Sequence, residues 1–226
     1  QQVLSVIDQK GCDRLICLGD IVGYGPFPNE CCDIIQNRAD ICVLGNHDAV
    51  ITGVMSLEYF NHYAKAALEW SAVNLKESAR AFLAALPLTM AENGLQFVHA
   101  APISPAKWSY LLSAAGAHEH LVGMAHDVAF IGHSHVPTAW RLNENGVVER
   151  RSAVNLSVGH GGRCIINVGS VGQPRDRNPD ACFGFYDVET GEFELQRVPY
   201  DIAATQKAMR KVNLPSFLIE RLSKGE

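Results

Sequence analysis

"RLICLGD" (14–20) and "ADICVLGNHD" (39–48) repeat one design along the chain. Each is a short, β-prone apolar run that ends in a glycine followed by polar residues, and a helical stretch (29–36) lies between them. This order predicts a β-α-β unit whose two strands are parallel and buried on both faces. The pair of segments therefore favours an α/β fold.

The rest of the chain extends this unit into layers. We expect an amphipathic helix at 1–10 that ends at Gly11, two helices within 56–86, strand-like runs from residue 95 onward with hairpin turns at Asn145-Gly146 and Thr190-Gly191, and a helical tail at 201–222 interrupted at Pro215. Because no repeat, low-complexity segment or linker divides the sequence, a single domain over residues 1–226 is predicted.

Composition excludes several classes of protein. The 226 residues are 47% hydrophobic with a net charge of −5, and no basic stripe could follow a phosphate backbone, which argues against long nucleic acid as a partner. No apolar stretch has bilayer length, and the first residues lack the layout of a signal peptide. Seven cysteines without a CxxC pair indicate reduced thiols and a cytoplasmic protein.

Metal-capable side chains follow four of the apolar runs, and they are Asp20, then Asn46, His47 and Asp48, then His99, and finally His133 and His135. Taken singly, an Asp after a strand is more often a turn or capping residue, and one His on an apolar strand is more often a core imidazole. Together they occupy equivalent strand ends, and the carboxyl ends of parallel strands form the edge where α/β proteins bind ligands. Oxygen and imidazole ligands suit Mn²⁺, Zn²⁺ or Fe.

Six motifs in this order, GDIVGYG (19–25), GNHD (45–48), VHAAP (98–102), GHSHVP (132–137), INVGSVGQPRD (166–176) and VPYDIAATQ (198–206), resemble the calcineurin-like metallophosphoesterases. The resemblance covers nearly the whole chain and points to the small bacterial and archaeal phosphoesterases rather than to the protein Ser/Thr phosphatases. It implies a four-layer α/β/β/α sandwich.

The resemblance also implies a ligand set for two divalent metal ions. Asp20 would bridge the two ions, Asn46, His99 and His133 would complete the second site, and His135 would belong to the first. The implied ions are Mn²⁺ foremost, with Fe, Zn or Ni as alternatives.

The implied reaction is hydrolysis of a small phosphorylated substrate, a phosphodiester in preference to a phosphomonoester, by attack of a metal-bridging hydroxide. His47 would approach the phosphate and leaving group, and Asp48 would orient its ring. Tyr24 and Arg175 are candidates for shaping the substrate pocket, with Asn46 beside them. An exposed arginine in a polar turn is the alternative for Arg175.

Relatives begin with a strand that ends in an Asp-x-His motif, and no such motif occurs in residues 1–19. We therefore expect an N-terminally truncated sequence that lacks the first strand and leaves the first metal site incomplete. Four other histidines are interpreted as structural or solvated, and Trp108 as a core or loop residue; the histidines are His118, His120, His126 and His160.

Two other functions are compatible with the motifs. One is a non-catalytic interaction module that keeps the phosphoesterase fold, and the other is a regulatory protein whose metal site binds phosphate without turnover. The intact His47, His99, His133 and His135 favour the enzyme. No motif defines an oligomeric state.

Overall fold

The computed structural model describes residues 1–158 and 162–226, so the interpretation of His160 lies outside the described residues. The predicted β-α-β unit is present. β1 (Ile16–Cys17) and β2 (Ile41–Cys42) are parallel neighbours in register, and α2 (Pro28–Arg38) connects them. Proline at the start of α2 suits the first helical turn, where its missing N–H costs no hydrogen bond.

A six-stranded sheet forms the centre of the molecule, in the order β3-β4-β5-β9-β6-β7. Its three middle strands β4, β5 and β9 run parallel, whereas β3, β6 and β7 pair antiparallel. The predicted Asn145-Gly146 turn joins β6 to β7. The bounds are β3 Thr89–Glu92, β4 Leu95–Val98, β5 Val128–Ile131, β6 Thr138–Leu142, β7 Val148–Arg151 and β9 Arg163–Asn167.

A smaller antiparallel sheet has the order β10-β11-β8. β10 (Ala181–Asp187) and β11 (Glu192–Val198) form the hairpin predicted at Thr190-Gly191, and β8 (Leu156–Ser157) pairs with the start of β11.

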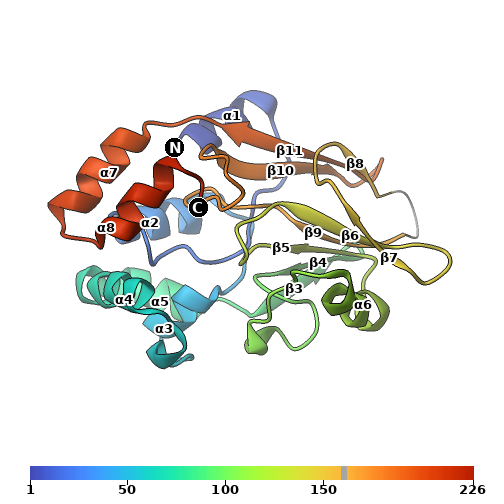
Figure 1. Ribbon diagram of the computed structural model, residues 1–226, viewed down its shortest axis with the longest axis horizontal. Helices are drawn as coiled ribbons and strands as arrows, with labels where there is room; N and C mark the ends of the chain where they lie inside the picture. Colours follow the sequence, from blue (N-terminus) through green and yellow to red (C-terminus); the bar gives the residue numbers. More distant parts are fainter. Residues whose placement is uncertain (159–161) are drawn as a thin grey trace.

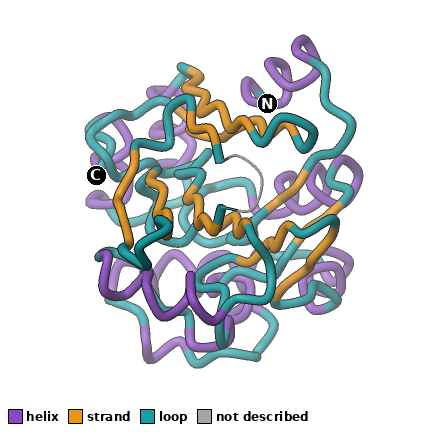
Figure 2. Tube along the Cα trace, turned by 90° about the vertical axis from the view of Figure 1, so that its right-hand side faces the viewer, coloured by secondary structure: helices purple, strands orange, loops and turns teal. Residues whose placement is uncertain are grey.

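Helices cover the outer faces of these sheets and one end of the molecule, as Figures 1 and 2 show. The α-helices besides α2 are α1 Gln2–Lys10, α3 Asn46–Ile51, α4 His62–Asn74, α5 Glu77–Ala84, α6 Ala114–Gly123, α7 Ile202–Lys211 and α8 Ser216–Glu220, with 3₁₀ turns at Leu57–Tyr59, Pro105–Lys107 and Arg221–Ser223. α1 ends at Gly11 as predicted, where a φ of 76° requires the conformational freedom of glycine.

Alternate residues of the central strands point to opposite faces of the sheet and pack in two separate hydrophobic clusters. Phe97, Phe130 and Ile166 face the cluster that includes Phe193 of the smaller sheet, whereas Val98 and its neighbours on the opposite face pack against α6. This period-two division fills the space between the sheets on one face and under a helix on the other. With α1 packed against β10 in a third cluster, the layers follow the α/β/β/α order that the motifs predicted.

Two strands were absent from the expectations, β3 and the two-residue β8. β3 is exposed at all four positions, so it shows no apolar alternation, and it is held by antiparallel pairing with β4 and by the ion pair between Arg14 and Glu92. Among the described residues, no helix is long and apolar enough to span a membrane.

Candidate metal centre

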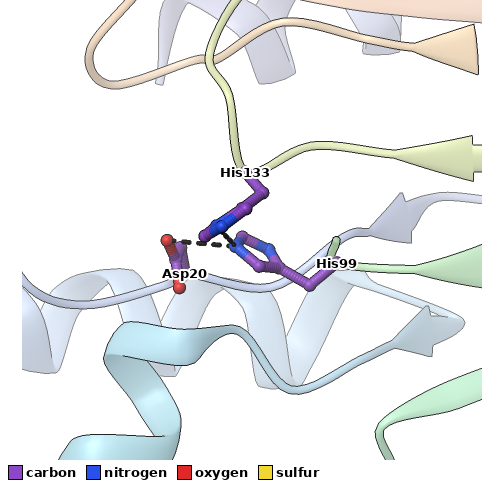
Figure 3. Close-up of side chains that lie close together, drawn as sticks. All are labelled: Asp20, His99 and His133. Atoms are coloured by element: carbon purple, nitrogen blue, oxygen red, sulfur yellow. Dashed lines mark hydrogen bonds and ion pairs between the residues drawn. The ribbon is translucent and has the colours of Figure 1, made fainter. Parts of the chain in front are cut away.

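Four residues that follow the ends of four different strands lie close together in the structure. Asp20 follows β1, Asn46 begins α3 just after β2, His99 directly follows β4, and His133 follows β5. Because these strands end on the same side of the molecule, residues far apart in sequence meet there, as Figure 3 shows for three of them.

His99 lies at the centre of the group. Its Nε2 atom is 3.2 Å from Oδ2 of Asp20, 3.1 Å from Oδ1 of Asn46 and 3.2 Å from Nδ1 of His133. The potential ligand atoms of Asp20, His99 and His133 all lie within 4.8 Å of one another. These side chains are buried or nearly so, which strengthens every electrostatic interaction among them.

Each imidazole ring makes one hydrogen bond on the side away from the group, and this bond fixes which of its two nitrogens carries the hydrogen. His99 Nδ1 donates to the Leu18 carbonyl at 2.7 Å, and His133 Nε2 donates to the Trp108 carbonyl at 3.0 Å. With those hydrogens committed, both rings turn an unprotonated nitrogen toward the oxygens of Asp20 and Asn46.

Four acceptors therefore face each other with no donor between them, an arrangement that requires positive charge. Burial lowers the pKa of His133 to about 3, so its ring is neutral at neutral pH. At His99 burial also opposes the charged form, but the Asp20 carboxylate outweighs it and raises the pKa of His99. Either a proton or a metal cation can supply this positive charge. Neutral imidazole nitrogens together with carboxylate and amide oxygens are ligands that fit a divalent metal ion.

His135 lies near this group but outside it. Its Nδ1 donates to the Gln173 carbonyl at 2.6 Å, and burial, then Arg175, lowers its pKa to about 3. Its Nε2 therefore keeps a lone pair, but His135 does not join the cluster of ligand atoms formed by Asp20, His99 and His133.

Three residues at the site have a strained backbone. Asp20, His133 and His135 adopt φ angles of 54°, 64° and 60°, a left-handed region that non-glycine residues seldom occupy. The loop that carries Asp20 also passes very close to Gly45, since a Cβ atom on Gly45 would lie 2.1 Å from Oδ1 of Asp20. The glycine before Asn46 is thus required for the two loops to meet.

His47 is placed beside the metal centre. Its backbone N–H donates to Oδ1 of Asp20 at 2.9 Å, and its ring packs between Tyr24 and Phe60 at centroid distances of 4.4 and 5.1 Å. Ring atom Nδ1 is buried without a hydrogen-bond partner in the described structure. A Cβ on Gly23 would lie 2.1 Å from that nitrogen, so the GDIVGYG loop leaves room for the ring.

The role expected for Asp48 needs correction. Its carboxylate accepts hydrogen bonds from the backbone N–H groups of Ile21, Val22 and Gly45 at 3.0 to 3.4 Å, and the contacts of the described residues include none between it and the His47 ring. As the third residue of α3, it satisfies free N–H groups at the helix start and joins the two loops. Burial, with the charge of Asp20, raises the pKa of Asp48 to about 7.

Tyr24 and Arg175 meet at the edge of the site. The Arg175 guanidinium lies 5.5 Å from the Tyr24 ring centre, and its Nη2 donates to Oε1 of Gln173 at 2.9 Å. Arg175 is half-buried. The alternative of an exposed arginine in a turn is therefore wrong.

Two residues that the sequence did not single out contact His133. The Trp108 carbonyl fixes its tautomer, and Tyr110 stacks on its ring at a centroid distance of 3.9 Å and an angle of 21°. Trp108 reaches this position through a φ of 53°. No local pattern in the segment 104–110 signals that conformation, and only its aromatic pair could have drawn attention.

The fold and site define a class, an α/β protein with a candidate metal centre at its strand ends. The family model of the calcineurin-like phosphoesterase superfamily domain matches residues 1–191, and the chain belongs to this superfamily.

Similar proteins match the chain over nearly its full length. The chain is 37% identical over 227 residues to the uncharacterized protein MJ0912 of Methanocaldococcus jannaschii, covering 99% of this chain and 91% of the relative. A metallophosphoesterase from Sphaerobacter thermophilus superposes with a TM-score of 0.86 at 35% identity, covering 100% and 94% of the two chains. The hypothetical protein PH1004 of Pyrococcus horikoshii shares the fold, with a TM-score of 0.78 at 20% identity over 99% and 90%.

Proposed function

We propose that this protein is a metal-dependent phosphoesterase that hydrolyses small phosphodiesters, with phosphomonoesters as the second substrate class. The observation that carries the proposal is a set of four acceptors, His99 Nε2 and the three atoms around it, with no donor among them in the described residues. Membership of the phosphoesterase superfamily supplies the reaction class.

Asp20, Asn46, His99 and His133 would hold one divalent ion, and Asp20 with His135 would contribute to a second. Mn²⁺ is the proposed physiological ion, with Fe, Zn and Ni as alternatives. When bound, such ions polarise phosphoryl oxygens and lower the pKa of water.

The chain's own residues would bind and orient the substrate. Arg175 offers a planar guanidinium that suits two phosphate oxygens, and the Tyr24 ring beneath it limits how the arginine can move. His47, beside Asp20, would stabilise charge on the departing oxygen. Burial lowers the pKa of His47, so a neutral ring that donates a hydrogen bond is the proposed form at neutral pH. Seven free thiols are consistent with the further proposal of a cytoplasmic location.

The test is turnover of bis(p-nitrophenyl) phosphate and p-nitrophenyl phosphate with Mn²⁺, Zn²⁺, Fe²⁺ and Ni²⁺ in turn. We expect p-nitrophenol release that a chelator abolishes, and loss of both metal content and turnover in Asp20→Asn. Stoichiometric metal binding without turnover of either ester would favour the non-catalytic alternative. Absence of metal binding would contradict the proposed metal-dependent function, with or without turnover.

A further inference from the structure

Two cysteines lie side by side on the strands that lead to the candidate metal centre. β1 and β2 are parallel, and Cys17 of β1 is the register partner of Cys42 of β2. Asp20 follows Cys17 by three residues, and Asn46 follows Cys42 by four. A change in how these two strands are joined therefore occurs close to two of the candidate metal ligands.

The side chains of Cys17 and Cys42 point to the same face of the two-stranded sheet. The residues before and after each cysteine pack in or against the hydrophobic cluster that includes Phe193; they are Ile16, Leu18, Ile41 and Val43. Successive side chains of a strand point to opposite faces, so both cysteines point away from that cluster. Two register partners on one face of adjacent strands are nearest neighbours across the sheet.

The spacing of the two strands suits a disulfide bond. Neighbouring strands lie about 4.7 to 4.9 Å apart, and the Cα atoms of a disulfide are usually about 4.4 to 6.8 Å apart. The Cβ atoms of a disulfide are closer, at about 3.8 Å, so closing the bond must draw the two strands together locally. A bond formed under strain is more easily reduced, which is typical of reversible disulfides.

Both thiols are free and partly exposed, so a small oxidant can reach them. Hydrogen bonding with Cys42 lowers the pKa of Cys17, whereas the same interaction, and then burial, raises the pKa of Cys42. The thiolate is the nucleophilic form of cysteine, so Cys17 is the more reactive of the two. Among the described strands, no other register pair joins two cysteines.

We propose that Cys17 and Cys42 form a reversible oxidative modification site, at which hydrogen peroxide converts the two thiols to a disulfide. The Cys17 thiolate attacks one peroxide oxygen, the O–O bond breaks, and Cys17 becomes a sulfenic acid while the other oxygen leaves as water with the proton that Cys17 released. The Cys42 sulfur then attacks the Cys17 sulfur, the S–O bond breaks, and the sulfenic hydroxyl leaves as water with the Cys42 proton. Two electrons pass from the thiols to the peroxide.

The disulfide acts on the candidate metal centre through two contacts. The Leu18 carbonyl, at the end of β1, accepts the Nδ1 hydrogen of His99 at 2.7 Å. The loop after β2 brings Gly45 so close to Asp20 that a Cβ there would lie 2.1 Å from its backbone nitrogen. Drawing β1 toward β2 shifts both contacts, and the loss of a partner that orients a metal ligand costs roughly 10- to 100-fold in metal affinity. Weaker metal binding after oxidation is the part of the proposal that rests on the proposed function.

The test treats the reduced full chain with an equimolar amount of hydrogen peroxide. Wild type should lose two of its seven free thiols, and peptide mass spectrometry should identify a Cys17–Cys42 link that dithiothreitol removes. Cys42→Ser should instead retain a Cys17 sulfenic acid that dimedone traps. Cys31→Ser, at an exposed position of α2, is the matched control and should form the same link as wild type. By isothermal titration, Mn²⁺ should bind the oxidised chain at least about tenfold more weakly, and reduction followed by removal of dithiothreitol should restore the affinity.

Two results would overturn the modification site. One is oxidation of the exposed Cys12 or Cys31 while Cys17 and Cys42 stay reduced, and the other is a link from Cys17 to any cysteine except Cys42. A Cys17–Cys42 bond that leaves Mn²⁺ affinity unchanged would overturn the control of the metal centre. The thiol count and the linked peptide require neither metal nor turnover. A wild type that forms the bond but does not hydrolyse bis(p-nitrophenyl) phosphate with Mn²⁺ would therefore reject only the phosphoesterase function.

Discussion

At the scale of single residues, the backbone of His47 and the candidate metal centre share the Asp20 carboxylate. Among the described residues, the hydrogen bond to Asp20 comes from the His47 backbone, and the ring nitrogen Nδ1 has no hydrogen-bond partner. We therefore expect the candidate metal ligands to keep their positions when the ring is removed.

His47→Ala is accordingly expected to lower kcat for bis(p-nitrophenyl) phosphate roughly a hundredfold or more, the usual loss of a general acid or electrostatic stabiliser. Bound metal, measured by elemental analysis, should equal that of wild type. His118→Ala, at an exposed position of α6, is the matched control and should lose nothing. Full activity in His47→Ala would remove His47 from the mechanism, and parallel loss of metal would make it a ligand.

Tyr110 provides a second prediction at this scale, because it stacks on His133 from a half-exposed position. An aromatic pair contributes about 0.5 to 1.5 kcal/mol, so Tyr110→Ala should weaken Mn²⁺ binding by roughly two- to tenfold. Tyr110→Phe should retain wild-type affinity. Tyr59→Ala, which removes a 79% exposed ring, is the control. Equal affinities in Tyr110→Ala and wild type would show that the stack does not hold the ligand.

At the scale of elements, the junction of β2 with α3 depends on Gly45. A Cβ there would lie 2.1 Å from both the backbone nitrogen and Oδ1 of Asp20, and backbone cannot move aside as a flexible side chain can. Gly45→Ala should therefore displace Asp20 and reduce bound metal severalfold in elemental analysis. Gly25→Ala, where a Cβ meets nothing within 4 Å, should bind metal normally. Normal metal content in both variants would contradict this account of the loop.

The elements also show what the sequence could predict. Apolar runs followed by glycine predicted β1 and β2, and Asn-Gly and Thr-Gly dipeptides predicted two hairpins, because these signals are local. β3 lacks a buried face, so no alternation predicts it. The contacts of Asp48 and of the Trp108 carbonyl depend on loops brought together by folding, and hydrogen-bond partners at such distances leave no local pattern. The strand-end residues could be chosen from sequence, whereas their partners could not.

At the scale of the whole molecule, the candidate metal centre connects two parts of the fold. Asp20 and Asn46 follow the two-stranded β1-β2 sheet, whereas His99 and His133 follow strands of the six-stranded sheet. Without positive charge the four acceptors repel one another across that boundary. A cation bound there would attract both parts and would bind the folded chain in preference to the unfolded one.

Mn²⁺ should therefore raise the unfolding temperature. At a free concentration one hundred times Kd, binding adds about 2.7 kcal/mol, which for a chain of this length corresponds to roughly 5 to 10 °C in differential scanning fluorimetry. Asp20→Asn should flatten the response to Mn²⁺, and it should also lower the unfolding temperature of the metal-free protein at acidic pH, because the Asp20 carboxylate raises the pKa of His99 and pairs with its protonated ring. Asp187→Asn, at an exposed position of β10, should respond to Mn²⁺ as wild type does. Equal unfolding temperatures of metal-free Asp20→Asn and metal-free wild type at acidic pH would show that a protonated His99 does not pair with Asp20.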